Sequence, residues 1–130
     1  MARSHPLLPR PTDAELTILR VLWERGPSTV RQVNEALSAS RGTGYTTTLK
    51  LMQIMADKGL VTRNETARTH VYASAAAQEQ TQRQLVQDLA DRAFGGSAAQ
   101  LVLRALSAEG ASDAEVKEIR KLIDDYREKR

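Results

Sequence analysis

Residues 44–58, GYTTTLKLMQIMADK, have two chemically different sides when wound as a helix. At about 100° per residue, Thr48, Leu51, Met52 and Met55 fall together on one side, which suits a protein core. The opposite side carries hydroxyl, ammonium and amide groups, from Thr46, Lys50 and Gln53. Such groups contact base edges and phosphates when a helix enters a DNA groove, although an ordinary solvated helix shows the same pattern.

The preceding residues predict a first helix with a marked beginning and end. Thr12 and Glu15 have the spacing of a capping box, and an apolar stripe follows until Gly26 and Pro27 stop the helix. Trp23 lies on that stripe, so we expect it in the core rather than stacked on a base.

A short second helix is predicted over STVRQVNEALSAS, residues 28–40, with Ser28 or Thr29 as its cap. Its buried stripe comprises Val30, Val33, Ala36 and Leu37. The segment SASRGTG, residues 38–44, contains two glycines and predicts a turn that leads into residues 44–58.

A β-hairpin is predicted directly after the third helix, which Gly59 ends. The runs LVTRN (60–64) and THVYA (69–73) are rich in β-branched residues and enclose a charged tip. Three helices followed by a hairpin form a winged helix-turn-helix, in which the third helix enters the groove and the hairpin lies along the backbone. The fold class is therefore mainly α with a small hairpin wing, followed by a C-terminal helical region.

Charge is distributed unevenly along the chain. Residues 1–73 contain ten Lys and Arg against six Asp and Glu, whereas residues 74–130 contain nine against ten. The basic first part favours a polyanion as partner, and we expect double-stranded DNA. The predicted DNA-contacting residues lie in the turn, on the outward side of the third helix and in the hairpin: Arg41, Tyr45, Thr46, Thr47, Lys50, Gln53, Arg63 and Arg68.

The ends of the chain differ from this central part. Residues 1–11 hold three of the four prolines and are predicted to be a flexible leader, in which Arg3 and Arg10 are solvated charges.

We expect residues 12–73 to form the winged-helix domain and residues 74–130 to form the helical dimerisation domain. No apolar run approaches the roughly 18 residues that span a bilayer, so we expect a cytoplasmic protein without membrane insertion.

The C-terminal part predicts three short amphipathic helices. Their apolar stripes have too little partner surface within about 55 residues, which favours a homodimer over packing back onto the winged helix. A dimer also suits a palindromic operator, because two copies bind two half-sites. The predicted dimerisation residues are Leu85, Leu89, Phe94, Leu101, Val102, Leu106, Val116, Ile119, Leu122 and Ile123.

Other function classes find little support. The chain has no cysteine and only two histidines, so we expect no disulfide, metal site or cofactor. It also lacks a phosphate loop and a nucleophile motif, which argues against an enzyme. Two alternatives stay open: a winged-helix protein-interaction module, and a regulator that senses a ligand directly.

Several stretches resemble the penicillinase repressors, the BlaI/MecI family of winged-helix regulators of β-lactamase and methicillin-resistance genes. They are LTILRVLWERGPSTVRQVNEAL, GYTTTLKLMQIMADKGLVTR, ARTHVYA and FGGSAAQLVLRAL. The resemblance implies a homodimeric repressor that occupies an inverted-repeat operator through its third helix and wing. It also implies release by a signal from a membrane sensor metalloprotease, typically in response to a β-lactam, that leads to cleavage of the repressor by a protease.

The chain departs from this family at identifiable positions. Some members are cleaved at an Asn-Phe bond whose counterpart here is Arg104-Ala105, so the resemblance does not carry that cleavage over. Members often have valine at Thr48, threonine at Lys50 and arginine at Ile54, which implies a different operator preference. A related branch senses copper through cysteines, and this route is excluded here.

Overall fold

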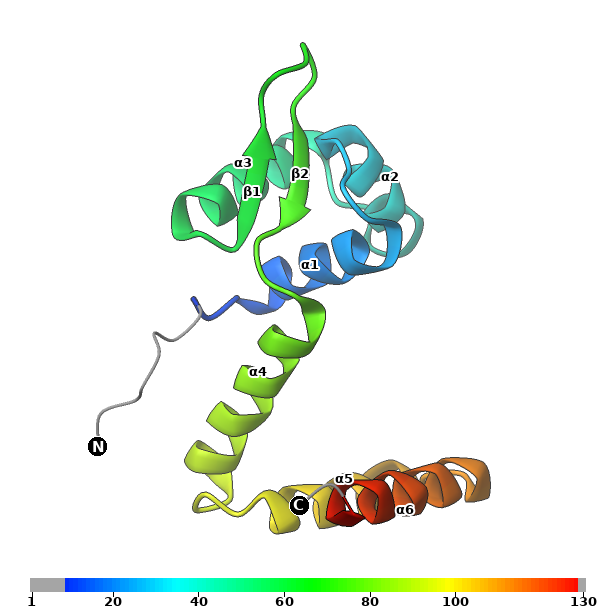
Figure 1. Ribbon diagram of the computed structural model, residues 1–130. Coiled ribbons are helices and arrows are strands. Elements are labelled where there is room, and N and C mark those ends of the chain that lie inside the picture. Colours follow the sequence, from blue (N-terminus) through cyan, green and yellow to red (C-terminus); the bar gives the residue numbers. More distant parts are fainter. Residues whose placement is uncertain (1–8, 129–130) are drawn as a thin grey trace, which may run out of the picture. The chain divides into compact units, whose positions relative to one another are not determined.

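The computed structural model describes residues 9–128, without the side chains of residues 40, 41, 108 and 109. Within this range, helices and one two-stranded antiparallel sheet follow one another in chain order (Figure 1). They are α1 (Asp13–Arg25), α2 (Val30–Arg41), α3 (Tyr45–Lys58), β1 (Val61–Asn64), β2 (Val71–Ser74), α4 (Gln78–Ala93), α5 (Ala98–Glu109) and α6 (Asp113–Glu128). The predicted fold class, mainly helical with a hairpin wing, is confirmed.

Side-chain caps determine where the first two helices begin. At the start of α1, the Glu15 amide donates to Thr12 Oγ1 at 3.2 Å, and the Thr12 amide donates to Glu15 Oε1 at 2.9 Å. At the start of α2, Thr29 and Gln32 form the same reciprocal pair. Each of these capping boxes gives hydrogen-bond partners to backbone N–H groups that the first turn of a helix leaves without one. Thr29, rather than Ser28, is therefore the cap of α2.

The turn between α2 and α3 is shorter than the predicted segment 38–44. Helix α2 continues to Arg41, and Gly42 ends it with a left-handed backbone at φ 64°. Residues 38–41 contain neither glycine nor proline, so nothing in them stops the helix, whereas glycine adopts positive φ without steric cost. The predicted turn was thus wrong for its first four residues.

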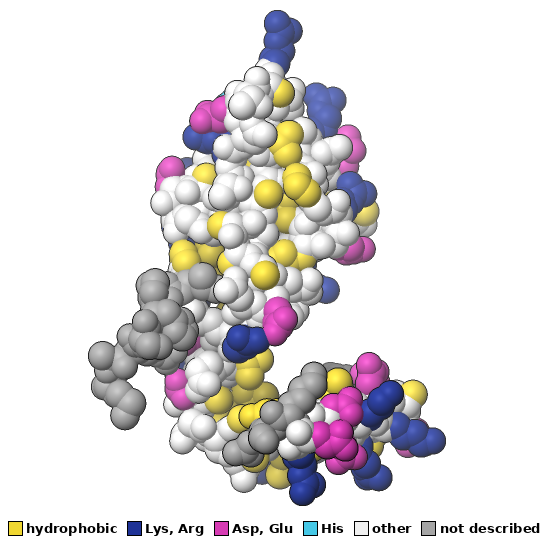
Figure 2. Space-filling model, viewed as in Figure 1, with side chains coloured by type: hydrophobic (Ala, Val, Ile, Leu, Met, Phe, Trp, Pro, Cys, Tyr) yellow, Lys and Arg dark blue, Asp and Glu magenta, His cyan; other side chains and the backbone are white. Residues whose placement is uncertain are grey.

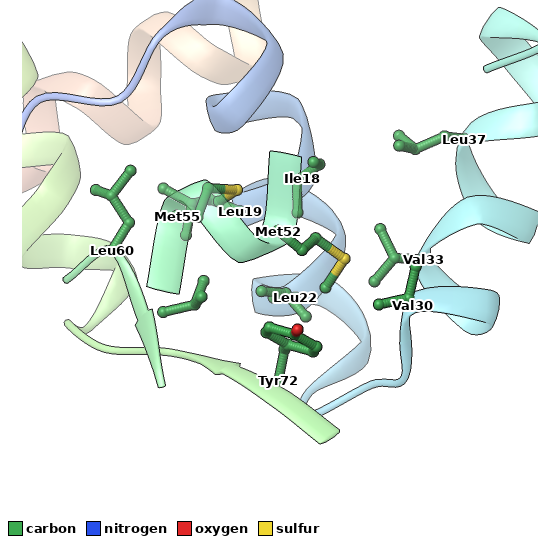
Figure 3. Packing of buried hydrophobic residues seen from close by; sticks show 11 residues of the cluster. Ile18, Leu19, Leu22, Val30, Val33, Leu37, Met52, Met55, Leu60 and Tyr72 are labelled. Atoms are coloured by element: carbon green, nitrogen blue, oxygen red, sulfur yellow. The ribbon is translucent and has the colours of Figure 1, made fainter. Parts of the chain in front are cut away.

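One hydrophobic core joins the three N-terminal helices and the hairpin. Figure 3 shows apolar side chains from α1, α2, α3 and β2 directed into a common interior. Each large apolar side chain that is fully buried contributes about 1.5–3 kcal/mol to the stability of the fold. The core therefore holds α3 in place. Its members are Ile18, Leu19, Leu22, Val30, Val33, Leu37, Met52, Met55, Leu60, Val61 and Tyr72.

The hairpin is attached to the helices by polar contacts as well. Val61 pairs with Ser74 at the base of the β1–β2 ladder. Ser28, before α2, exchanges two backbone hydrogen bonds with Tyr72, of 2.9 and 2.8 Å. Trp23 packs half-buried against the core, as predicted, and its Nε1 donates to Ser74 Oγ at 3.0 Å. The wing is therefore fixed to α1 and to the start of α2.

The chain divides into two compact units that meet within α4, the first ending at Leu85 and the second beginning at Val86. The predicted division of function between residues 12–73 and 74–130 stays a prediction. Of the predicted leader, residues 1–8 lie outside the described residues. Pro9 lies beside Gly59 at the end of α3.

Candidate nucleic-acid interface

Helix α3 has the two sides that its sequence predicts. Thr48, Met52 and Met55 are fully buried, and Leu51 is half-buried against the core. The opposite side faces solvent and presents short hydroxyl, ammonium and amide groups, a composition suited to DNA. Its predicted members are all exposed: Thr46, Thr47, Lys50 and Gln53.

A buried hydrogen bond fixes α3 against α2. Thr48 Oγ1 donates to Asn34 Oδ1 at 2.8 Å and also lies 3.2 Å from the Gly44 carbonyl oxygen. Thr48 has no exposed surface, so water could not replace Asn34, and the hydroxyl would keep only the longer contact with the Gly44 carbonyl oxygen. Asn34 was not identified from the sequence, since nothing local distinguishes it from other polar residues on α2.

An ion pair fixes the other end of α3. Lys58 Nζ lies 2.7 Å from Glu15 Oε1, the same oxygen that closes the α1 capping box. Glu15 is 2% exposed. Burial alone would raise the pKa of Glu15, but the hydrogen bonds from Lys58 and Thr12 together with the Lys58 charge outweigh it and lower that pKa below 4.5. Glu15 is therefore held as a carboxylate and ties the end of α3 to the start of α1.

The two predicted wing arginines lie in different surroundings. Arg63, on β1, has its Nε 3.6 Å from Glu65 Oε1, and His70 Nε2 lies 3.8 Å from the same oxygen. The Tyr72 side chain and the charge of Glu65 raise the pKa of Arg63. Arg68 is exposed in the loop between the strands, and no ion pair joins it to another described residue. Arg68 thus carries a charge that no described ion pair neutralises, whereas Arg63 has Glu65 beside it.

A cavity of about 340 Å³ lies between α3, the wing and the start of α2. It brings together three predicted residues from two elements, Tyr45 and Gln53 of α3 and Arg68 of the wing. Figure 2 shows Lys and Arg side chains around the upper part of the molecule, where the wing extends, with Asp and Glu side chains among them. The wing and α3 therefore line one cavity of the winged-helix unit, with the cation Arg68 on the wing side.

The cavity also includes basic residues that the sequence analysis did not assign to the interface. Arg31, in the first turn of α2, and His70, on the wing, both line it. A cation in the first turn of a helix opposes the helix dipole, and this unfavourable position was a usable signal for Arg31. The predicted Arg41 ends α2, but its side chain lies outside the described residues.

The predicted dimerisation residues are divided between half-buried and exposed positions on α4–α6. Leu85, Phe94, Leu101, Leu106 and Ile119 are half-buried. The other five expose between 37% and 60% of their surface: Leu89, Val102, Val116, Leu122 and Ile123. Three further apolar residues that were not in the predicted set are equally exposed: Val86, Leu103 and Tyr126.

Some features are absent from the described part of the chain. No helix within residues 9–128 has the length and apolar character needed to cross a membrane. In the same range, no cluster of three or more His, Asp and Glu side chains could hold a metal ion.

Three core-packed helices, an attached hairpin and a cavity lined by both α3 and the hairpin define a winged helix-turn-helix protein. The penicillinase repressor family matches residues 11–125, and the chain belongs to this family. It is thus a winged-helix transcriptional regulator of a DNA-binding repressor family.

Relatives and one solved structure agree with this assignment. The chain is 36% identical to the transcriptional regulator BlaI of Mycobacterium tuberculosis, strains CDC 1551 / Oshkosh and ATCC 25618 / H37Rv, over 110 residues, which cover 83% of this chain and 80% of each relative. These relatives are transcriptional regulators. The solution structure of the DNA-binding domain of the repressor BlaI has the same fold, with a TM-score of 0.51 and 21% identity, covering 58% of this chain and 93% of that domain.

Proposed function

We propose that the protein is a homodimeric repressor that binds an inverted-repeat operator through α3 and the wing. The observation that carries this proposal is the shared cavity, where Tyr45 and Gln53 of α3 lie alongside Arg68 of the wing. In a winged helix bound to DNA, the recognition helix occupies the major groove while the wing follows the adjacent backbone. As a DNA-binding regulator, the protein is expected to act in the cytoplasm.

The chemistry of the exposed side of α3 supports DNA over a protein partner. A protein-docking surface is built around apolar and aromatic anchors, whereas DNA binding needs cations and hydrogen-bonding groups. Within α3, the exposed positions at 46, 47, 50 and 53 are all polar, Lys50 adds a positive charge, and Tyr45 and Ile54 are the large apolar side chains that are also exposed. We assign base contacts to Thr46, Thr47 and Gln53, and phosphate contacts to Tyr45, Arg41, Lys50, Arg63 and Arg68.

The exposed apolar residues of α4–α6 support the dimer. Leu89, Leu122 and Ile123 each leave more than half of their surface open in the single chain. Covering such side chains with a second copy would remove apolar surface from water at about 25 cal/mol per Å². A two-fold dimer would also place two copies of α3 on two half-sites, about one helical turn of DNA or a multiple of it apart.

Release of the repressor is assigned to an upstream signal. The family points to a β-lactam-linked membrane sensor metalloprotease, followed by proteolysis of the repressor. Here the bond that corresponds to the known cleavage position joins Arg104 and Ala105, both exposed on α5. We therefore place any cleavage at a sequence different from Asn-Phe.

Selection of bound duplexes from a random library tests the proposal directly. The expected result is an inverted repeat, protected on both half-sites in a footprint, with an affinity that falls steeply as salt rises. Recovery of a single, non-repeated half-site would contradict the dimer. Absence of any duplex enrichment would contradict DNA binding and favour the protein-interaction alternative.

A further inference from the structure

Ile54 is an aliphatic side chain on the solvent-facing side of α3, and it is 39% exposed. It follows Lys50 by four residues, so the two side chains are separated by only about 40° around the helix axis. The buried Met52 and Met55 lie about 160° and 140° from Lys50. Ile54 therefore belongs to the outward side, about 60° from Leu51, which packs half-buried against the core.

The exposed neighbours of Ile54 on that side are all polar, and the apolar Leu51, three residues earlier, is half-buried against the core. Thr47 and Lys50 precede it by two turns and one turn, and Asp57 and Lys58 follow it, all of them exposed. Among the exposed residues of α3, Ile54 is the single aliphatic one. Its position cannot be explained by packing in the core, and a charged or amide side chain would suit water and helix formation at least as well.

We propose that Ile54 is a specificity-determining residue that packs against the C5-methyl group of a thymine in each half-site. The inference rests on the proposed function, in which α3 enters the major groove. The thymine methyl is the apolar group that base edges present in this groove, and apolar side chains are its usual partners. The thymine methyl group therefore matches Ile54, the single aliphatic side chain among the exposed residues of α3.

The geometry of α3 also limits where this thymine lies. Four residues advance a helix by about 6 Å, and successive base pairs are about 3.4 Å apart. The thymine therefore lies one or two base pairs from the position contacted by Lys50. Discrimination at this position depends on an uncharged methyl group whose contact releases no counterion, so it is insensitive to salt, whereas the Lys50 contribution is salt-dependent.

Replacing each thymine of a selected operator with deoxyuridine tests the inference, because the change removes only the methyl group. We expect one thymine in each half-site at which deoxyuridine weakens binding of the wild-type protein about fourfold, the worth of burying one methyl-sized group. The variant Ile54→Ala should bind the thymine operator more weakly and should no longer distinguish thymine from deoxyuridine there. Its dependence of affinity on salt should equal that of the wild type.

Lys50→Ala is the matched control on the same side of α3. It should weaken binding and reduce the salt dependence, while keeping the thymine preference. A wild-type protein indifferent to every deoxyuridine, or an Ile54→Ala variant with the full preference retained, would overturn the role of Ile54 and leave DNA binding intact. Failure of the wild-type protein to bind any duplex would overturn both. Circular dichroism of Ile54→Ala verifies that the exposed substitution leaves the fold unchanged.

Discussion

Lys58, the last residue of α3, reaches Glu15 in the first turn of α1, with 2.7 Å between Nζ and Oε1. The same carboxylate oxygen accepts the Thr12 amide, so one atom serves both a helix cap and an ion pair. Two elements separated by 43 positions in the sequence are thereby joined beside the core. The contact restrains the C-terminal end of the helix that we propose to enter DNA.

Lys58→Met should destabilise the protein by about 2 kcal/mol, because it leaves the buried Glu15 carboxylate with fewer partners. Urea unfolding, followed by circular dichroism, measures this loss. Lys50→Met is the matched control, since Lys50 is an exposed lysine of the same helix, and its effect should stay within about 0.5 kcal/mol. Equal midpoints for Lys58→Met and the wild type would show that the ion pair contributes nothing to stability.

Acidification should remove the stabilisation that Glu15 provides. The pKa of Glu15 is lower in the folded protein than its ordinary value of 4.5, so the unfolded chain binds this proton first as pH falls. The contribution is complete above that ordinary value and disappears as pH drops through the folded pKa. The free energy of unfolding should therefore fall more steeply with acid in the wild type than in Glu15→Gln. Parallel curves for the two proteins over this range would contradict the lowered pKa.

Thr48 and Asn34 should behave as an energetically coupled pair. Thr48→Val keeps the volume of the side chain but removes the hydrogen bond, and should cost about 1 kcal/mol. Asn34→Ala removes the other partner. Combining both changes in a double-mutant cycle should reveal a coupling free energy of about 1 kcal/mol in unfolding experiments. Strictly additive effects would mean that the 2.8 Å contact does not connect α2 with α3 energetically.

Lys50→Ala and Arg68→Ala should each weaken binding to a selected operator and lower the slope of log affinity against log salt by about one. The reason is that each cation that neutralises a phosphate releases a counterion on binding. Fluorescence anisotropy over a range of salt concentrations measures the slope. Lys117→Ala, on α6, is the control and should leave it unchanged. Unaltered slopes in both interface variants would remove these residues from the DNA contact.

Leu122→Asp should convert the dimer to monomers, because it places a charge among the exposed apolar residues of α4–α6. Leu122 is 60% exposed in the single chain, so the change should not disturb folding. Lys121→Asp, at the neighbouring exposed position, introduces the same side chain as a control and should leave the dimer intact. Sedimentation at micromolar concentration distinguishes the species. A monomeric wild-type protein under these conditions would contradict the proposed dimer.

The sequence by itself determined the elements and the two sides of α3. Capping residues, glycines and apolar spacing act over three or four positions, so Thr12 with Glu15 marks the start of α1 and Gly59 the end of α3. The same short-range periodicity separated buried Met52 from exposed Lys50. The start of the turn after α2 was misplaced because the turn was extended back to residue 38, whereas the helix continues up to the first glycine, Gly42.

Only the tertiary structure decided which distant residues meet. Glu15 and Lys58 each had a local explanation, as a capping residue and as a cation at a helix end, and neither pattern implied the other. Trp23 meets Ser74 across 51 positions, and Arg31 shares a cavity with the wing. These contacts depend on the packing of helices around a common core, which is set by the summed fit of many side chains and leaves no periodic signal in the sequence.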